Sequence, residues 1–223
     1  MEVYNFGNEE SNTVLIQPVG DHDMALLANE VKLIRELSMS SDFRLIAIKV
    51  DNWNDDLSPW ESPAVFGPEG FGGGADETLK YVLGEVIEPL KRQASNELRL
   101  YIGGYSLAGL FAFWTIYQSN IFSGCVAASP SAWFPGLEEY ISDKEPLTDK
   151  IYLSLGDKEE KTRNPVMSQV GNAIRGIYDQ LRQKVGVNVT LEWNQGNHFM
   201  EPDLRIAKGF AWILKLRRMT ELV

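Results

Sequence analysis

Cysteine and histidine are scarce in this sequence, whose 223 residues include one cysteine and two histidines. The single cysteine, Cys125, cannot form a disulfide within the chain, which is typical of a protein from a reducing compartment. It lies in the apolar run FSGCVAASP, a context that favours a small buried side chain over a nucleophile. The sequence also lacks an H-E-x-x-H motif, a cysteine pair and a cluster of histidines, so it predicts no metal site and no cofactor.

An excess of positive charge and long apolar runs are also lacking. The formal net charge is −10, which disfavours nucleic acids and anionic membrane surfaces as partners. No apolar run approaches the roughly 18 residues of a membrane-spanning helix. Residues 1–12 have neither the basic start nor the apolar stretch of a signal peptide. We therefore expect a cytoplasmic protein without nucleic-acid or membrane partners, and the sequence leaves its oligomeric state open.

Apolar strands and amphipathic helices alternate along the chain, which predicts an α/β fold. With 44% hydrophobic residues the chain can form one well-filled core, so we expect residues 1–223 to form a single domain. Because the strands are almost continuously apolar, helices should cover both faces of the sheet. The prediction is a three-layer α/β/α sandwich with a mostly parallel sheet of about six strands. The expected strands are residues 13–16, 43–50, 98–102, 122–128, 151–155 and 187–193, and the expected helices include residues 76–91, 165–184 and 203–218.

The most informative motif lies in residues 98–109, LRLYIGGYSLAG. A short apolar strand meets a tight turn with Ser106 at its apex, and apolar residues then recur at helical spacing. The small residues Gly104 and Ala108 let strand and helix approach closely. A nucleophile elbow needs this strand–turn–helix context. The string G-x-S-x-[GA] alone also occurs in ordinary glycine-rich turns, so the flanking strand and helix are what favour the elbow.

A serine nucleophile needs a base, and the base needs an orienting acid. Hydrolases with this elbow present nucleophile, acid and histidine in that order along the chain. His198 follows the expected strand 187–193 and precedes the last helix, which is the position of the base. A lone histidine in a loop is usually a surface residue without a role, but its place after the last strand favours catalysis. His22 precedes Ser106, so the chain order argues against it.

The acid is expected in the segment LSLGDKEEKTRN, after the strand 151–155. Glu159 is the first choice because it lies three residues beyond Gly156, where such acids often lie. Asp157 is the second choice, and Glu160 also competes. The other members of this charged segment are interpreted as a solvated loop.

These pieces resemble the esterase family of α/β-hydrolases that includes siderophore esterases and S-formylglutathione hydrolases. The similarity rests on GGYSLAGLFAFW, AASPSAWFPG, LSLGDKEEKTRN and GNHFMEPDLRIAKGFAW, with WNDDLSPW upstream, in family order over roughly residues 13–215. The resemblance implies a serine hydrolase with Ser106 as nucleophile, His198 as base and an acid within residues 157–160. The chain is short for this family, and we expect it to lack the extra N-terminal strands and a long lid insertion.

Acyl transfer also needs preformed donors for the oxyanion of the tetrahedral intermediate. The backbone N–H of Leu107, the residue after the serine, is expected to be one donor. The second should come from residues 17–21, after the first expected strand. Because Pro18 has no N–H, Val19 and Gly20 are the candidates, unless this loop merely connects strand to helix.

Aromatic residues in two long irregular stretches are candidates for the substrate pocket, because ligands of such sheets bind beyond the carboxyl ends of the strands. Trp53 and Trp60 lie in residues 51–74, and Trp133 and Phe134 lie in residues 130–149. For each of them, core packing under a long loop is the alternative.

The sequence therefore predicts a serine esterase that acts on a small-molecule ester through an acyl-enzyme intermediate. A thioesterase, an S-formylglutathione hydrolase or a siderophore lactone hydrolase with the same site is the alternative within enzymology. A hydrolase fold that binds a ligand without catalysis is the alternative outside it.

Overall fold

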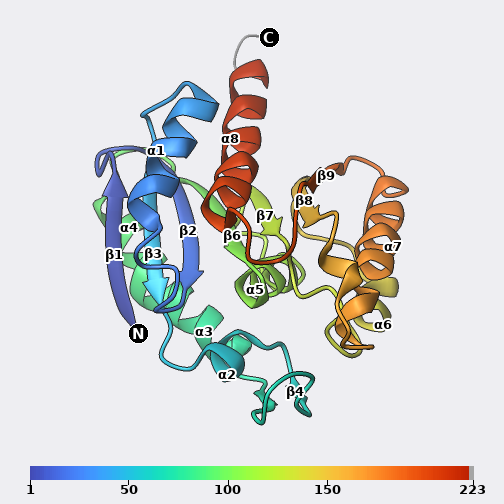
Figure 1. The fold of residues 1–223 in the computed structure, drawn as a ribbon. Helices are drawn as coiled ribbons and strands as arrows, with labels where there is room; N and C mark the ends of the chain where they lie inside the picture. The colour runs from blue at the N-terminus through green and yellow to red at the C-terminus, as the bar shows by residue number, and fades with distance from the viewer. Residues whose placement is uncertain (221–223) are drawn as a thin grey trace.

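A computed structural model describes residues 1–220 of the chain, and the side chains of residues 1–215. Its centre is a seven-stranded sheet with the order β1-β3-β2-β6-β7-β8-β9 (Figure 1). All neighbouring strands pair in parallel except β1, which is antiparallel to β3. The strands are β1 (Glu2–Gly7), β2 (Thr13–Val19), β3 (Arg44–Lys49), β6 (Arg99–Tyr105), β7 (Gly124–Ala128), β8 (Lys150–Gly156) and β9 (Asn188–Asn194).

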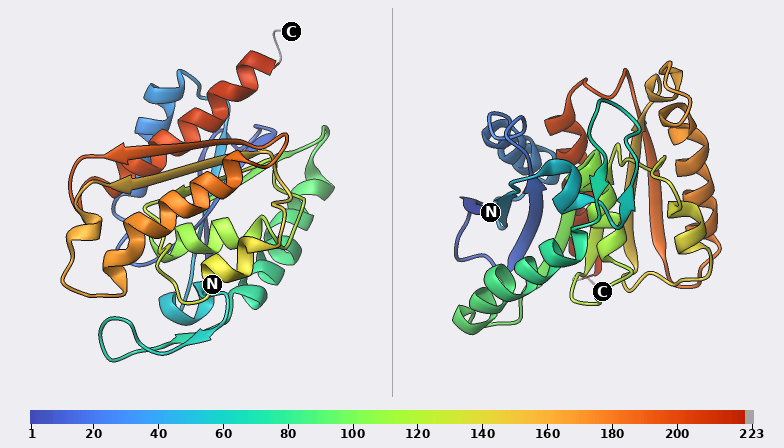
Figure 2. Two further views of the ribbon diagram at one scale, coloured as in Figure 1. Left: turned by 90° about the vertical axis from the view of Figure 1, so that its right-hand side faces the viewer. Right: turned by 90° about the horizontal axis from the view of Figure 1, so that it is seen from below.

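Helices cover both faces of this sheet, as the sequence predicts (Figure 2). One face is covered by α1 (Leu27–Ser38) and α8 (Pro202–Thr220), which form one core with it. The other face is covered by α3 (Ala75–Tyr81), α5 (Leu107–Thr115) and α7 (Val170–Arg182), which form a second, larger core. The predicted three-layer α/β/α sandwich is therefore confirmed.

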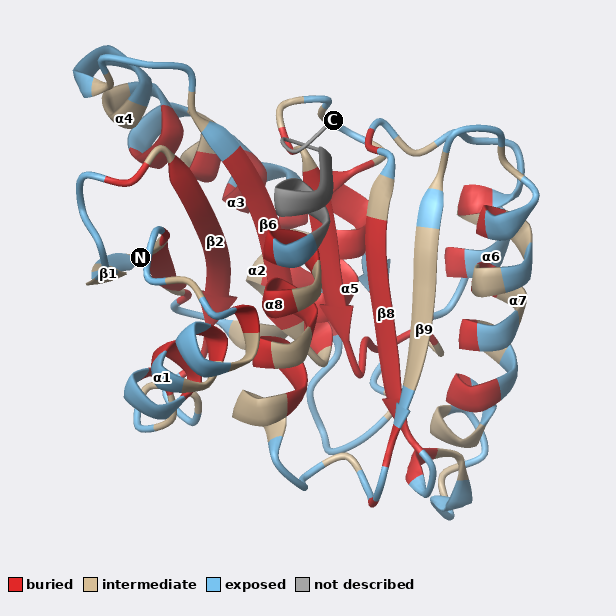
Figure 3. Ribbon diagram, turned by 90° about the horizontal axis from the view of Figure 1, so that it is seen from above, coloured by how far each residue is buried: buried red, intermediate tan, exposed pale blue. Residues whose placement is uncertain are grey.

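Burial follows the position of each strand in the sheet (Figure 3). Every residue of β2 and β7 is buried, whereas most residues of the edge strand β9 are half-buried. Two-sided burial explains why the central strands are continuous apolar runs that were visible in the sequence.

The N-terminal strand β1 corrects the expectation that extra N-terminal strands are lacking. Glu2–Gly7 pairs with β3, from Glu2 opposite Lys49 to Gly7 opposite Arg44. Only Tyr4 and Phe6 pack toward the core, where they are half-buried, and the other residues of the strand are exposed. An edge strand with one weakly apolar face gives little sequence signal, which is why it was missed.

The predicted helix 76–91 is also corrected, because the structure divides it. A π-helical segment, Val82–Ile87, joins α3 to α4 (Glu88–Gln93). The N–H of Glu88 donates to the carbonyl of Leu83, five residues back. The next residue, Pro89, has no N–H to donate and its ring crowds the preceding turn, which accounts for the wider winding there.

The two irregular stretches contain short elements. Residues 51–74 hold the five-residue helix α2 (Trp53–Leu57) and a hairpin of β4 (Glu61–Ser62) and β5 (Phe71–Gly72). Residues 130–149 hold α6 (Leu137–Ser142), and two 3-10 turns, Glu159–Lys161 and Met167–Gln169, follow β8. Within residues 1–220, no helix is both long and apolar enough to span a bilayer.

A buried acid pairs with an amide between α1 and β2. Nε2 of Gln17 donates to Oε2 of Glu30 at 3.2 Å, and Oε1 of Gln17 and Oε1 of Glu30 are buried without a hydrogen-bond donor. Burial, opposed by the Gln17 hydrogen bond, raises the pKa of Glu30 to about 8, and the charges of Asp23 and Asp203 add to the rise. A proton on Glu30 would turn one of its oxygens into a hydrogen-bond donor.

Glu30→Gln is expected to stabilise the protein at pH 8 and to leave its stability near pH 4.5 almost unchanged. The folded state holds the Glu30 proton up to about pH 8, whereas the unfolded chain releases it near 4.5, so wild-type stability falls as pH rises through this window. The penalty reaches on the order of 4 kcal/mol, and glutamine removes it. Urea unfolding of both proteins between pH 4.5 and 9 measures the difference.

The control is Glu36→Gln, which changes an exposed acid of the same helix that pairs with Lys32. It should alter stability by less than about 0.5 kcal/mol at any pH. A gain for Glu30→Gln that does not grow with pH would contradict the assignment of a buried, protonated Glu30.

Candidate active site

The turn after the central strand β6 has the backbone geometry of a nucleophile elbow. Ser106 has a φ of 57°, a conformation that a non-glycine residue rarely adopts. Its N–H donates to the carbonyl of Ala128, and its own carbonyl accepts from Ser131. These contacts hold the strained residue between β6 and α5, with its side chain at the carboxyl end of the sheet.

Gly104 explains how strand and helix approach so closely at this turn. A Cβ atom at Gly104 would lie 2.4 Å from the backbone of Ala108, a separation that real structures do not show. The methyl group of Ala108 itself is accommodated and buried. The departure from the usual glycine at this second position therefore has no steric consequence.

Three side chains from distant parts of the sequence form one hydrogen-bonded row at this edge. Nε2 of His198 lies 2.9 Å from Oγ of Ser106, and Nδ1 of His198 lies 2.7 Å from Oε2 of Glu159. A proton on Nδ1 donates to the carboxylate, which leaves Nε2 to accept the hydroxyl proton of Ser106. The arrangement can move a proton from the serine to the imidazole while the carboxylate balances the resulting charge.

Glu159 is buried and is held as a carboxylate. Burial opposes ionisation, but the hydrogen bond and charge of His198, the N–H of Gly156 and the hydroxyl of Ser129 outweigh it, so the pKa of Glu159 lies below its ordinary value. Oε1 of Glu159 accepts from Gly156 N at 2.7 Å and from Ser129 Oγ at 2.8 Å. The acid is therefore ionised at neutral pH and fixed on both oxygens.

The other titratable candidates have different partners. Oδ1 of Asp157 accepts from the N–H of Gly196 at 2.7 Å and so braces the loop before His198. Glu160 forms a two-point ion pair with Arg175, and His22 lies beside Asp23 in an exposed turn. Of the acids after β8, the structure places Glu159, the first choice, against the imidazole. In the described chain, no group of three or more His, Cys, Asp or Glu side chains is arranged to hold a metal ion.

The expected oxyanion donors differ in availability. The N–H of Leu107 lies at the first turn of α5, where helices leave backbone donors without intrahelical acceptors. Val19 is the buried last residue of β2, and its carbonyl accepts from Val50. The N–H of Gly20 already donates to Oδ2 of Asp23 at 2.9 Å. For Gly20 to bind an oxyanion, Asp23 would have to release it.

The four expected pocket aromatics pack against other side chains. The ring of Trp53 meets His22 edge-on at 4.8 Å, and Trp60 contacts Phe134 at 5.7 Å between ring centroids. Phe134 is fully buried, and Trp133 contacts Phe71 of the hairpin.

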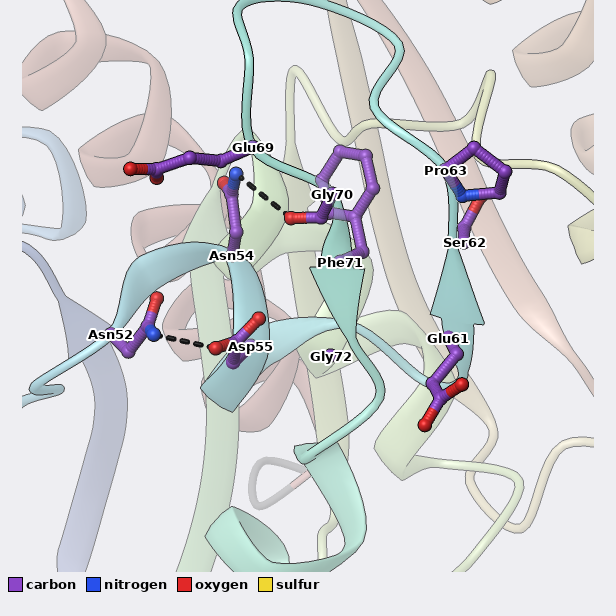
Figure 4. A pocket seen from close by; sticks show the side chains of 10 residues that line it. All are labelled: Asn52, Asn54, Asp55, Glu61, Ser62, Pro63, Glu69, Gly70, Phe71 and Gly72. Atoms are coloured by element: carbon purple, nitrogen blue, oxygen red, sulfur yellow. Dashed lines mark hydrogen bonds between the residues drawn. The ribbon is translucent and has the colours of Figure 1, made fainter.

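A cavity of about 750 Å³ lies between α2 and the β4–β5 hairpin (Figure 4). None of the four aromatic candidates lines it. Phe71 belongs to both places, because it lines the cavity and also packs on Trp133 and Phe134. The cavity is lined by Asn52, Asn54, Asp55, Glu61, Ser62, Pro63, Glu69, Gly70, Phe71 and Gly72.

Sequence reasoning missed three residues that surround the row. The hydroxyl of Tyr105 donates to the carbonyl of His198 at 2.7 Å, and its ring contacts the imidazole at a tilt of 41°, with 5.2 Å between ring centroids. Oγ of Ser129 and Nη1 of Arg205, a residue of α8, both donate to Oε1 of Glu159, each at 2.8 Å. A signal for Arg205 was available, because it falls one turn before Gly209 and two before Ile213 on the buried side of α8.

The parallel sheet, the strained elbow after its central strand and the helices on both faces define the α/β-hydrolase fold. Solved structures with this fold include an IroE-like serine hydrolase from Shewanella oneidensis, with a TM-score of 0.78 and 15% identity over 96% of this chain and 75% of that one. The siderophore hydrolase EstA from Aspergillus nidulans is similar at a TM-score of 0.70 and 19% identity, over 92% of this chain and 83% of that one. Esterase PE8 is similar at a TM-score of 0.57 and 16% identity, over 97% of each chain.

Comparisons of sequence give fewer matches than comparisons of structure. No family model matches the chain. The uncharacterized protein YbbA of Bacillus subtilis (strain 168) is 22% identical over 172 residues, which cover 72% of this chain and 68% of that protein. At such identities the likeness is one of fold.

Gly104→Ala is expected to destabilise the protein by about 3 kcal/mol, because the added methyl group forces β6 away from α5. Urea unfolding measures the loss. Gly84→Ala is the matched control, since a Cβ atom there meets nothing within 4 Å and the site is an exposed helical position. The control should be neutral or stabilising by up to about 1 kcal/mol. Equal stability of the two variants would contradict the steric account of the elbow.

Proposed function

We propose that this protein is a serine hydrolase that cleaves carboxylic esters through an acyl-enzyme intermediate. The observation that carries the proposal is the row Ser106–His198–Glu159, with 2.9 Å and 2.7 Å between its hydrogen-bonding atoms, on a serine held at a φ of 57°. An ordinary glycine-rich turn requires neither the strained serine nor a buried carboxylate behind the histidine. The proposed substrate is a small-molecule ester, and the proposed chemistry needs no cofactor.

The proposed reaction has two halves. Oγ of Ser106 attacks the ester carbonyl carbon while Nε2 of His198 takes the hydroxyl proton, and Glu159 stabilises the imidazolium. The N–H of Leu107 binds the oxyanion, with a second donor proposed from Val19 or Gly20. The intermediate collapses, the C–O bond to the alcohol breaks, and the alcohol leaves with the proton from His198. Water, deprotonated by His198, then attacks the acyl-enzyme and releases the acid and Ser106.

The named neighbours support the class of reaction and suggest where to look for a substrate. All three solved structures are described as hydrolases or esterases, and one is described as acting on siderophores. Siderophore esters therefore belong among the first natural substrates to assay. Thioesters belong in the same panel, because the proposed site attacks both kinds of carbonyl.

Ser106→Ala is expected to abolish turnover of p-nitrophenyl esters, at least about 1000-fold, without unfolding the protein, because it removes the attacking oxygen. Release of p-nitrophenol from acetate through octanoate esters measures activity, and labelling by a fluorophosphonate reports on the serine directly. Ser142→Ala, an exposed serine of α6, is the control and should keep full activity. A folded wild type that neither turns over esters nor accepts the fluorophosphonate would favour a non-catalytic binding protein.

Glu159→Gln is expected to lower kcat by about 1000-fold, because a neutral amide no longer stabilises the imidazolium or fixes its tautomer. Asp157→Asn should cost less than about 10-fold, since Asp157 only braces the loop through the N–H of Gly196. Steady-state kinetics on one ester compare the two. The reverse order of losses would move the role of the acid to Asp157.

A further inference from the structure

Arg205 is the most completely buried charged side chain at the site. It lies in the first turns of α8 with 1% of its surface exposed. Nη1 donates to Glu159 Oε1 at 2.8 Å, and to the hydroxyls of Tyr105 and Ser129 at 3.1 Å each. Nη2 donates to two carbonyl oxygens, that of Gln195 at 3.2 Å and that of Asn197 at 2.8 Å. One guanidinium thus joins the ends of β6, β7 and β8 to the loop that carries His198.

Stability alone gives a poor account of this residue. Taking a guanidinium and a carboxylate out of water costs several kcal/mol per ion, and buried ion pairs are often replaceable by apolar residues without loss. The next buried positions of α8, Ile206, Ala207 and Phe210, carry apolar side chains as expected. Arg205 instead directs Nη1 of its guanidinium to the acid and Nη2 to the loop that carries His198.

The consequence for Glu159 is geometric. Its Oε1 accepts from three donors, namely Gly156 N, Ser129 Oγ and Arg205 Nη1. That set fixes the plane of the carboxylate and leaves Oε2 to face Nδ1 of His198. Arg205 also donates hydrogen bonds to the carbonyl oxygens on both sides of Gly196. The same guanidinium therefore fixes both the acid and the loop that carries the base.

We propose that Arg205 is a positioning residue for ester hydrolysis that acts through Glu159. It orients the carboxylate toward His198, and it does not touch the substrate. This inference rests on the proposed function, because it assigns a role within the same site.

The first test compares Arg205→Met with wild type on a p-nitrophenyl ester. We expect kcat to fall about 100-fold and KM to change less than about 2-fold, because misplacement of the acid slows proton transfer and leaves the substrate pocket intact. Arg205→Lys keeps the positive charge but cannot donate from two nitrogens at once, and its kcat should fall about 10-fold. The control is Arg175→Met, which removes the exposed ion pair with Glu160, the residue beside Glu159, and should keep wild-type kcat.

A double-mutant cycle with Glu159→Gln separates positioning through Glu159 from general support of the fold. In the Glu159→Gln background, Arg205→Met should lose less than about 5-fold further. The low-field proton NMR resonance of His198 Nδ1–H should be present in wild type and in Arg175→Met, and should be lost or shifted upfield in Arg205→Met. Circular dichroism and thermal unfolding establish that each variant is folded. If Arg205→Met does not fold, Arg205→Lys is used in its place in the kinetic, double-mutant and NMR measurements.

Two outcomes would overturn the inference while the proposed function stands. One is a folded Arg205 variant with wild-type kcat and an unchanged His198 resonance. The other is a full, additive loss in the Glu159→Gln background, which would place the action of Arg205 elsewhere. Failure of the proposed function gives a different result, because wild type itself would then show no Ser106-dependent turnover or fluorophosphonate labelling, and the role assigned to Arg205 would fall with it.

Discussion

The buried carboxylate of Glu159, shared between an imidazole and a guanidinium, is the interaction around which the carboxyl edge of the sheet is arranged. A charge in that environment needs several partners, because an unpaired buried carboxylate is too costly to keep. Four segments deliver them: the ends of β7 and β8, the loop after β9, and the first turns of α8. The pairing therefore draws segments far apart in sequence to a single point, and Ser106 lies next to it.

The strained backbone of Ser106 persists because contacts on both sides of the residue fix its conformation. The serine is bonded through its backbone to β7 and to the turn after it, while α5 packs entirely within the larger core. A positive φ at a non-glycine residue costs on the order of 1–3 kcal/mol and persists only where neighbouring contacts determine it. The close approach at Gly104 is part of the same arrangement, since it brings the first turn of α5 against β6.

The fold and the site carry different kinds of information. The architecture is shared with hydrolases at identities of 15–19%, so packing of apolar layers can be conserved in shape while most side chains change. A fold of this kind hosts many activities, and the case for ester hydrolysis rests on the distances among Ser106, His198 and Glu159. Near that site, the hairpin and α2 border a cavity that none of the four expected pocket aromatics lines.

The sequence by itself determined the α/β class, the covered sheet and the elbow, because each depends on local periodicity, strand burial or glycine at a tight turn. It also limited the base to His198 by chain order and ranked Glu159 first by its spacing from Gly156. The sequence did not predict the edge strand β1 or the π-helical segment at Val82–Ile87. Pairing at a sheet edge and the wider winding before Pro89 give only a weak pattern of apolar residues in the sequence. Only the tertiary structure decided which acid faces the imidazole, which donors are already occupied and that Arg205 joins them, because those contacts link residues up to 100 positions apart and no local pattern encodes such a distance.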